Sequence, residues 1–151
     1  MKRYVWVVPF PQRSDDCGKH SDEYWKLWTY IQEIYGGGAC AAAYAPEKGS
    51  RWTLVVEYLN KIFLEQRNDP FALNFLARCY AEGEGVERDM KKARQGFLDA
   101  GNLLLPVAWF NLGILHSLEC NPNFIEVVNC FTMGKRLGCS FCANKISALG
   151  A

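Results

Sequence analysis

The chain has 151 residues, of which 50% are hydrophobic and 22% are charged, and its formal net charge is +1. These values predict one globular domain with a buried core. The near-zero net charge excludes a global electrostatic attraction to nucleic acid or to an anionic membrane. No stretch of the sequence approaches the run of about 18 to 20 apolar residues that spans a bilayer. We therefore expect neither a nucleic-acid partner nor a membrane partner.

The amino terminus and the seven cysteines favour a cytoplasmic protein. An odd number of cysteines leaves one without a disulfide partner, which secreted proteins usually avoid. The apolar run at the amino terminus is interrupted by Pro9 and Pro11 and lacks the cleavage site of a secretory signal. We expect residues 1–19 to form an extended arm, with Trp6 or Phe10 in an apolar groove, or else a partly disordered tail. No second strand candidate is found to pair with this arm.

A single helical-repeat domain is expected over residues 20–151, and it begins with a degenerate pair of helices over 20–66. Ser21 is a good N-cap, and apolar residues at helical spacing follow it until Gly36. The glycines and proline of 36–50 predict a loop or a short Ala-rich turn. A second helix follows this interruption and completes the degenerate pair.

The rest of the chain repeats itself, and it divides into clear repeats over 70–104 and 105–138 and a terminal helix over 139–151. Ala72 recurs as Ala108, 36 positions later, at the same helical spacing, and the next shift is 34 positions. A period in this range is typical of stacked helix pairs, each of which buries its apolar face only against a neighbour. The predicted fold is all-α: an α/α superhelical solenoid of antiparallel helix pairs, about seven helices in all, after an extended amino-terminal arm.

Caps and turns mark the helix ends within the clear repeats. Pro70 and Pro106 are favoured at the start of the first helix of each pair, and Asp89 and Asn123 are strong caps for the second helix. Both glycines of the EGEGV turn are expected at positive φ. Close helix packing is expected at the small residues Ala72, Ala77, Ala93, Ala100, Ala108 and Gly113 and at the larger Phe97 and Phe131.

These residues resemble the Sel-one-like repeat family, a relative of the tetratricopeptide repeat, from residue 70 to about residue 147. The family pattern runs A-x3-LG, an xxGxGV turn, D-x3-A, an aromatic residue, A, and a Gly before the next pair. The matching positions are Ala72, Leu76, Gly83, Gly85, Val86, Asp89, Ala93, Phe97, Ala100, Ala108, Leu112 and Gly113. Ala77 and Leu104 stand where the family has Gly, and the second turn has lost both glycines.

The resemblance implies a non-enzymatic adaptor that holds a peptide or protein partner in the groove of a curved helical scaffold. It brings no catalytic residue, metal ligand or cofactor with it. In related tetratricopeptide arrays the ligand lies against the first helices of successive pairs. Carried over by register, the partner-binding residues are Asn74, Arg78, Phe110, Ile114, Phe141 and Asn144. The alternative is that these side chains are buried, either by the arm or by a second subunit. A homodimer formed through the arm or the terminal helix is a further candidate assembly.

The motif Cys139-Ser-Phe-Cys142 carries the alternative function, that of a small metal-binding or thiol-redox protein. A structural zinc would need further ligands, for which Cys120, Cys130 or His116 could be proposed. Cys142 also falls at a packing position of the repeat, where a buried small side chain explains it. No nucleophile elbow, phosphate loop or paired-carboxylate motif is present in the sequence, so we expect no enzymatic activity.

Overall fold

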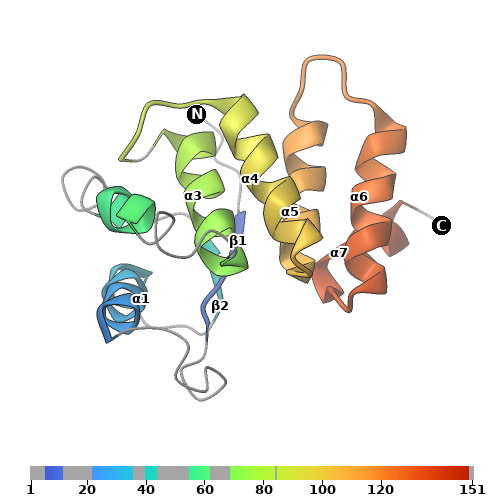
Figure 1. The fold of residues 1–151 in the computed structure, drawn as a ribbon. Helices are drawn as coiled ribbons and strands as arrows, with labels where there is room; N and C mark the ends of the chain where they lie inside the picture. The colour runs from blue at the N-terminus through green and yellow to red at the C-terminus, as the bar shows by residue number, and fades with distance from the viewer. Residues whose placement is uncertain are drawn as a thin grey trace.

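The computed structural model describes residues 6–11, 22–35, 40–43, 55–61, 69–83 and 85–149 (Figure 1). The described chain is mostly helical, as the repeat predicts. The expected cap at Ser21 and most of the arm over 1–19 lie outside the described residues. Among the described helices, none has the length and apolar character needed to cross a membrane.

The helices end close to where the sequence predicts. Residues 55–61 are helical, and the other helices are α1 (Asp22–Tyr35), α3 (Pro70–Glu82), α4 (Met90–Asn102), α5 (Pro106–Ser117), α6 (Phe124–Arg136) and α7 (Ser140–Ala148). The carboxylate of Asp89 accepts the N–H groups of Lys91 and Lys92 at the start of α4, and Asn123 caps α6 in the same way. Gly83 closes α3 with a φ of 67°. Because these signals are local, the sequence alone identifies them.

Neighbouring helices of the carboxy-terminal half pack against each other in chain order, from α3 through α4, α5 and α6 to α7 (Figure 1). The small residues expected at the contacts are buried there, including Ala93 and Ala100. In α4, Gly96 approaches α3 so closely that an added Cβ would lie 2.8 Å from the Cβ of Ala77. Phe97 and Phe131 fill the space between helices and are buried, as predicted.

The amino-terminal arm is paired, which corrects the expectation that it has no partner strand. Strand β1 (Trp6–Pro9) runs antiparallel to β2 (Cys40–Ala43), with Trp6 opposite Ala43 and Pro9 opposite Cys40. Strand β2 lies within the stretch 36–50, for which we predicted a loop or turn. Its sequence, CAAA, has low β-propensity, so the pairing with β1, and not local preference, accounts for the strand.

Strand β1 also packs on α3 and α5 and is buried on both faces. Because side chains of a strand alternate between its faces, Trp6 and Val8 join the main apolar cluster, whereas Val7 joins a second cluster formed by α5, α6 and α7. The ring of Trp6 stacks on Phe97 with 5.5 Å between centroids. Phe10 is buried against Trp28. Trp6 and Phe10 are therefore both buried in the main apolar cluster.

Candidate functional site

Two buried asparagines hold the backbone of β1 against the helices. Asn74 on α3 and Asn111 on α5 are both 0% exposed. The Val7 N–H donates to Oδ1 of Asn111 at 2.9 Å, and Nδ2 of Asn111 donates to the Val7 carbonyl oxygen at 2.8 Å. Nδ2 of Asn74 donates to the same carbonyl at 3.2 Å, and Nδ2 of Asn111 donates to Oδ1 of Asn74 at 2.9 Å. The two amides and one residue of backbone therefore form a closed polar network inside an apolar groove.

This network places β1 between two sets of hydrogen-bonding groups. Adjacent residues of a strand direct their N–H and C=O groups to opposite edges. Because the backbone groups of Val7 bond to the asparagines, the backbone hydrogen bonds to β2 are left to Trp6 and Val8. Pro9 shares the helix-facing edge with Val7, so its missing N–H removes no ladder bond. Asn111 thus acts on β1 as a neighbouring strand would.

Side chains on both faces of β1 anchor it in the groove. Val7 packs in a buried cluster with Phe110, Val127, Phe131, Cys139 and Cys142. On the opposite face, Nε1 of Trp6 donates to Oε1 of Glu82 at 2.6 Å, in addition to the stacking on Phe97. A buried indole N–H usually needs such an acceptor. The groove therefore combines a backbone clamp with an aromatic site and a small apolar site.

The six predicted partner-binding residues are divided between buried and exposed positions. Asn74 and Arg78 are 0% exposed, Phe110 is 7% exposed, and Ile114 is half-buried. The arm covers this part of the groove, which is the alternative raised for these residues, since β1 bonds to Asn74 and packs through Val7 with Phe110. Phe141 is 43% exposed, Asn144 is exposed, and the ring of Phe141 lies 5.5 Å from that of Phe110. Partner binding at the exposed positions stays a prediction.

Asn111 is the residue of this polar network that the repeat register does not identify. The repeat aligns Phe110, not Asn111, with Asn74, so spacing alone selects the neighbouring position. A signal was present, because Asn111 is an uncharged polar residue in the middle of the strongly apolar helix α5, PVAWFNLGILHS. A buried amide in such a setting requires hydrogen-bonding partners.

The two cysteines of the CSFC motif meet at the start of α7. Cys139 is the N-cap, and its Sγ accepts the N–H of Cys142 at 3.4 Å. A hydrogen bond from the Cys142 thiol, followed by backbone N–H groups of α7, lowers the pKa of Cys139 to about 6, although burial opposes this shift. The same hydrogen bond and burial raise the pKa of Cys142. Burial also raises the pKa of Cys130 to about 11.

Of the further metal ligands considered from the sequence, Cys130 lies close enough to Cys142 to raise the pKa of that thiol, whereas Cys120 and His116 have other surroundings. Cys120 is exposed in the turn after α5. Nδ1 of His116 lies 3.5 Å from Oε1 of Glu119, which also accepts from Arg94 at 2.7 Å. Within the described ranges, no group of three or more His, Cys, Asp and Glu side chains is arranged to hold a metal ion.

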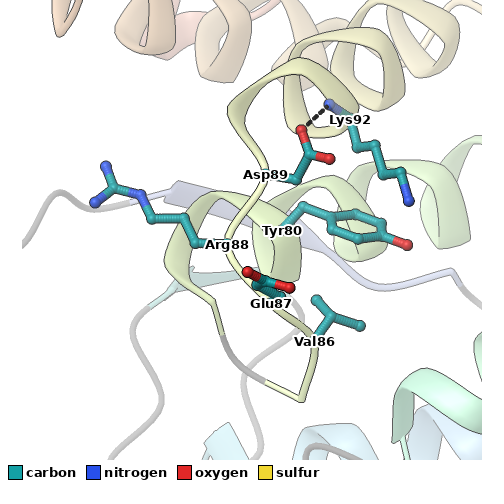
Figure 2. A pocket seen from close by; sticks show the side chains of 6 residues that line it. All are labelled: Tyr80, Val86, Glu87, Arg88, Asp89 and Lys92. Atoms are coloured by element: carbon teal, nitrogen blue, oxygen red, sulfur yellow. Dashed lines mark hydrogen bonds between the residues drawn. The ribbon is translucent and has the colours of Figure 1, made fainter.

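A separate pocket lies at the turn between α3 and α4 (Figure 2). Its lining residues are Tyr80, Val86, Glu87, Arg88, Asp89 and Lys92. Nζ of Lys92 lies 5.3 Å from the centroid of the Tyr80 ring, a cation–π distance. Asp89 is engaged as the cap of α4, and its own N–H donates to the carbonyl of Tyr80 at 3.0 Å. The polar contacts of this pocket thus hold the turn in place.

Comparison with known proteins adds no family or relative to these observations. No protein-family model matches the chain, and no curated protein matches it.

Proposed function

We propose that the protein is a non-enzymatic scaffold that binds a peptide or protein partner on the concave face of a Sel-one-like α/α solenoid. One observation carries this proposal. Asn74 and Asn111 hold an extended stretch of backbone in an apolar groove between the first helices of two successive pairs. A surface that seats a polypeptide strand in this way has the chemistry of a peptide-binding groove.

The repeat geometry supports the solenoid arrangement. Leu104 and Gly138 occupy the same place in consecutive repeats, and both adopt positive φ, at 69° and 94°. Ala72, Ala108 and Cys142 share one repeat position and are all 0% exposed. Equivalent backbone and equivalent burial at equivalent positions are typical of stacked repeat units.

The partner would contact the exposed end of this face, on α7. The ring of Phe141 lies next to that of Phe110, and Phe141 is 43% exposed. Asn144 stands at the repeat position of Asn74 and is exposed. An open aromatic side chain beside an open amide offers one apolar anchor and one polar clamp.

Selection from a random peptide library on the immobilised full chain tests this proposal. We expect the selected peptides to bind Phe141→Ala and Asn144→Ala at least about fivefold more weakly, because truncating an interface anchor typically costs on the order of 1 kcal/mol or more. The matched controls are Phe124→Ala and Asn129→Ala, which remove the same side chains from exposed positions on α6. Equal loss in the controls, or a library from which no peptide is enriched, would contradict the proposal.

We propose thiol–disulfide exchange at Cys139 and Cys142 as a second candidate, because Cys139 caps α7 with its sulfur against the Cys142 N–H. The two thiols would give two electrons and two protons to a low-molecular-weight disulfide. A bond would then form between the two Sγ atoms, and the small disulfide would leave as two thiols. Incubation with oxidised glutathione followed by peptide mass mapping tests this step. A bridge joining Cys139 to Cys142 supports it, and recovery of both as free thiols at every ratio of oxidised to reduced glutathione opposes it.

A further inference from the structure

We infer that the groove between α3 and α5 takes an extended peptide strand, not a helix, and that β1 is the resident which such a strand replaces. This inference rests on the proposed function, because it names the kind of partner that the scaffold would bind. It is carried by the hydrogen bonds that Asn74 and Asn111 make to Val7.

The first step concerns what the two amides require. Asn111 uses its oxygen to accept from the Val7 N–H and its nitrogen to donate to both the Val7 carbonyl and Asn74. Both asparagines are fully buried, so water does not replace these partners in the closed groove. A groove emptied of its strand would leave buried donors and acceptors unpaired, which is costly. The groove must therefore contain a group that offers a donor and an acceptor together.

The second step concerns which occupant offers that pair. A residue in a strand presents its N–H and C=O to the same edge, and Asn111 forms hydrogen bonds with both groups of one residue. Within a helix these groups are already bonded to each other along the chain, so a helix offers neither. An extended segment of a partner protein satisfies the pair, and the asparagines read its backbone independently of its sequence.

The third step concerns side chains. The contacts of β1 show which residues fit: a β-branched residue at the position of Val7, in the cluster with Phe110 and Phe131. The preceding position takes an aromatic residue with an N–H donor, which stacks on Phe97 and bonds to Glu82. The partner segment is therefore apolar, with Trp followed by Val or Ile.

The fourth step concerns competition. A tethered strand acts at an effective concentration on the order of millimolar, so a partner must make contacts that β1 does not make. Phe141 is exposed beside Phe110 of the cluster that holds Val7, and Asn144 is exposed three residues further along α7, so both are open to supply such contacts. A strand long enough to reach them gains affinity over the resident.

The experiment uses the full chain carrying Val7→Pro, which removes the N–H that Asn111 accepts and weakens the resident strand. A fluorescent peptide that copies residues 4–11 is titrated against this variant and against the unaltered chain. We expect the variant to bind the peptide about tenfold more tightly, because the resident has lost one buried hydrogen bond. A peptide methylated on the backbone nitrogen at the position of Val7 should bind the variant about tenfold more weakly than the parent peptide.

The matched control peptide carries its methyl group on the terminal nitrogen and should bind like the parent. A helix-forming peptide with the same Trp and Val content should not bind. Equal binding by the peptide methylated at the Val7 position, or binding by the helix, overturns the inference and leaves the proposed function standing, because a partner still binds. If no peptide binds while circular dichroism shows a folded variant, β1 is a permanent part of the core and the inference also fails. The library selection at Phe141 and Asn144 then decides the proposed function separately.

A measurement on the unaltered chain keeps the test valid if Val7→Pro does not fold. The side-chain amide signals of Asn74 and Asn111 are followed by ¹⁵N-resolved NMR while unlabelled peptide is added in excess over the effective concentration of the tethered strand, on the order of millimolar, so that it competes without additional contacts. We expect both signals to shift with the parent peptide and to stay in place with the peptide methylated at the Val7 position. The inference is overturned if the signals shift with neither peptide, or if they shift equally with both.

Discussion

The ring of Phe131 on α6 packs directly on the α-carbon of Gly113 on α5. A Cβ added to Gly113 would lie 2.6 Å from Cε1 of Phe131, well inside van der Waals contact. The contact lies where the sequence repeat predicts close helix approach, and it explains why a helix interior tolerates a residue of low helix propensity. The pair α5–α6 therefore depends on the absence of one methyl group.

Gly113→Ala should destabilise the protein despite the better helix propensity of alanine. Alanine gains about 1 kcal/mol of propensity over glycine in a helix interior, whereas overpacking a rigid aromatic contact costs typically about 1 to 3 kcal/mol. We expect a net loss of unfolding free energy, measured by urea denaturation. In a double-mutant cycle, Phe131→Leu should relieve part of this loss. A more stable Gly113→Ala variant would mean that the two helices are farther apart than described.

Leu104→Gly should stabilise the protein. Leu104 adopts a φ of 69° and is 71% exposed, so its side chain contributes little packing while its backbone lies in the left-handed region. That conformation costs an L-residue roughly 1 to 2 kcal/mol, which glycine avoids. The greater freedom of glycine in the unfolded chain offsets part of this gain in stability. We expect a net gain of about 0.5 to 1 kcal/mol in chemical denaturation. The control Leu103→Gly, at a φ of −88°, should lose stability instead.

The helix boundaries could be predicted because their signals are local. Asp89 and Asn123 bond to N–H groups two and three residues away, so the cap and the helix occur in one short stretch of sequence. Strand β2 could not be predicted in this way, because CAAA becomes a strand only through β1, more than 30 residues earlier. Local propensity contains no information about that pairing.

The repeat register identifies part of the surface that β1 covers, and the arm is one of the alternatives that the sequence analysis raises for those residues. A repeat period gives the spacing of equivalent residues, and it placed Asn74, Phe110 and Asn144 on one stripe. It does not tell which side chains a separate segment of the chain will cover, and so the register selected Phe110 where Asn111 makes the polar contact. The burial of Asn74 by Val7 depends on a contact 67 residues apart, which no local pattern records.

Phe110→Ala and Phe141→Ala should separate the covered part of the groove from the open part. If both side chains were exposed in an open groove, their truncation would leave the melting temperature unchanged in both variants. Because Phe110 is 7% exposed and packs in the cluster that holds Val7, its truncation should cost about 3 to 5 kcal/mol. Phe141 is 43% exposed, and its truncation should cost about 1 kcal/mol or less. Thermal melts of the two variants check this difference, and equal melting temperatures would contradict it. Arg78→Ala should destabilise as Phe110→Ala does, since Arg78 is 0% exposed.

Asn111→Leu tests the polar network by a change that nearly preserves volume. Leucine removes the acceptor for the Val7 N–H and the donor to Oδ1 of Asn74, so these two buried groups lose their partners, whereas the Val7 carbonyl keeps the bond from Asn74. Each unsatisfied buried group costs about 1 to 3 kcal/mol. The unfolding free energy should therefore fall by more than the loss of one surface contact would lower it. Hydrogen exchange at the Val7 amide should accelerate as well. Asn144→Leu at the exposed repeat position is the control, and an equal effect there would show that the network is unimportant.

The pH dependence of Cys139 reactivity follows from its place at the start of α7. The Cys142 thiol and the backbone N–H groups hold the pKa of Cys139 at about 6, and only the thiolate attacks an alkylating reagent. The labelling rate of Cys139 with iodoacetamide should therefore rise up to about pH 6 and then level off. An ordinary cysteine continues to gain reactivity up to about pH 8.5. Exposed Cys120 provides the internal comparison in the same mass-spectrometric experiment.

The same pKa shift predicts how stability depends on pH. The folded pKa of Cys139, about 6, lies below the value of about 8.5 for an unfolded cysteine, so the folded chain binds fewer protons between these values. Its contribution to stability is therefore fully present above about pH 8.5 and is lost as the pH falls through 6. The raised pKa of Cys142 acts with the opposite sign: its contribution is present below about pH 8.5 and is lost at higher pH. Urea unfolding between pH 5 and 8 should show stability rising with pH, and Cys139→Ser should flatten that rise. If the variant and the unaltered chain respond equally to pH, Cys139 is not held as a thiolate in the folded protein.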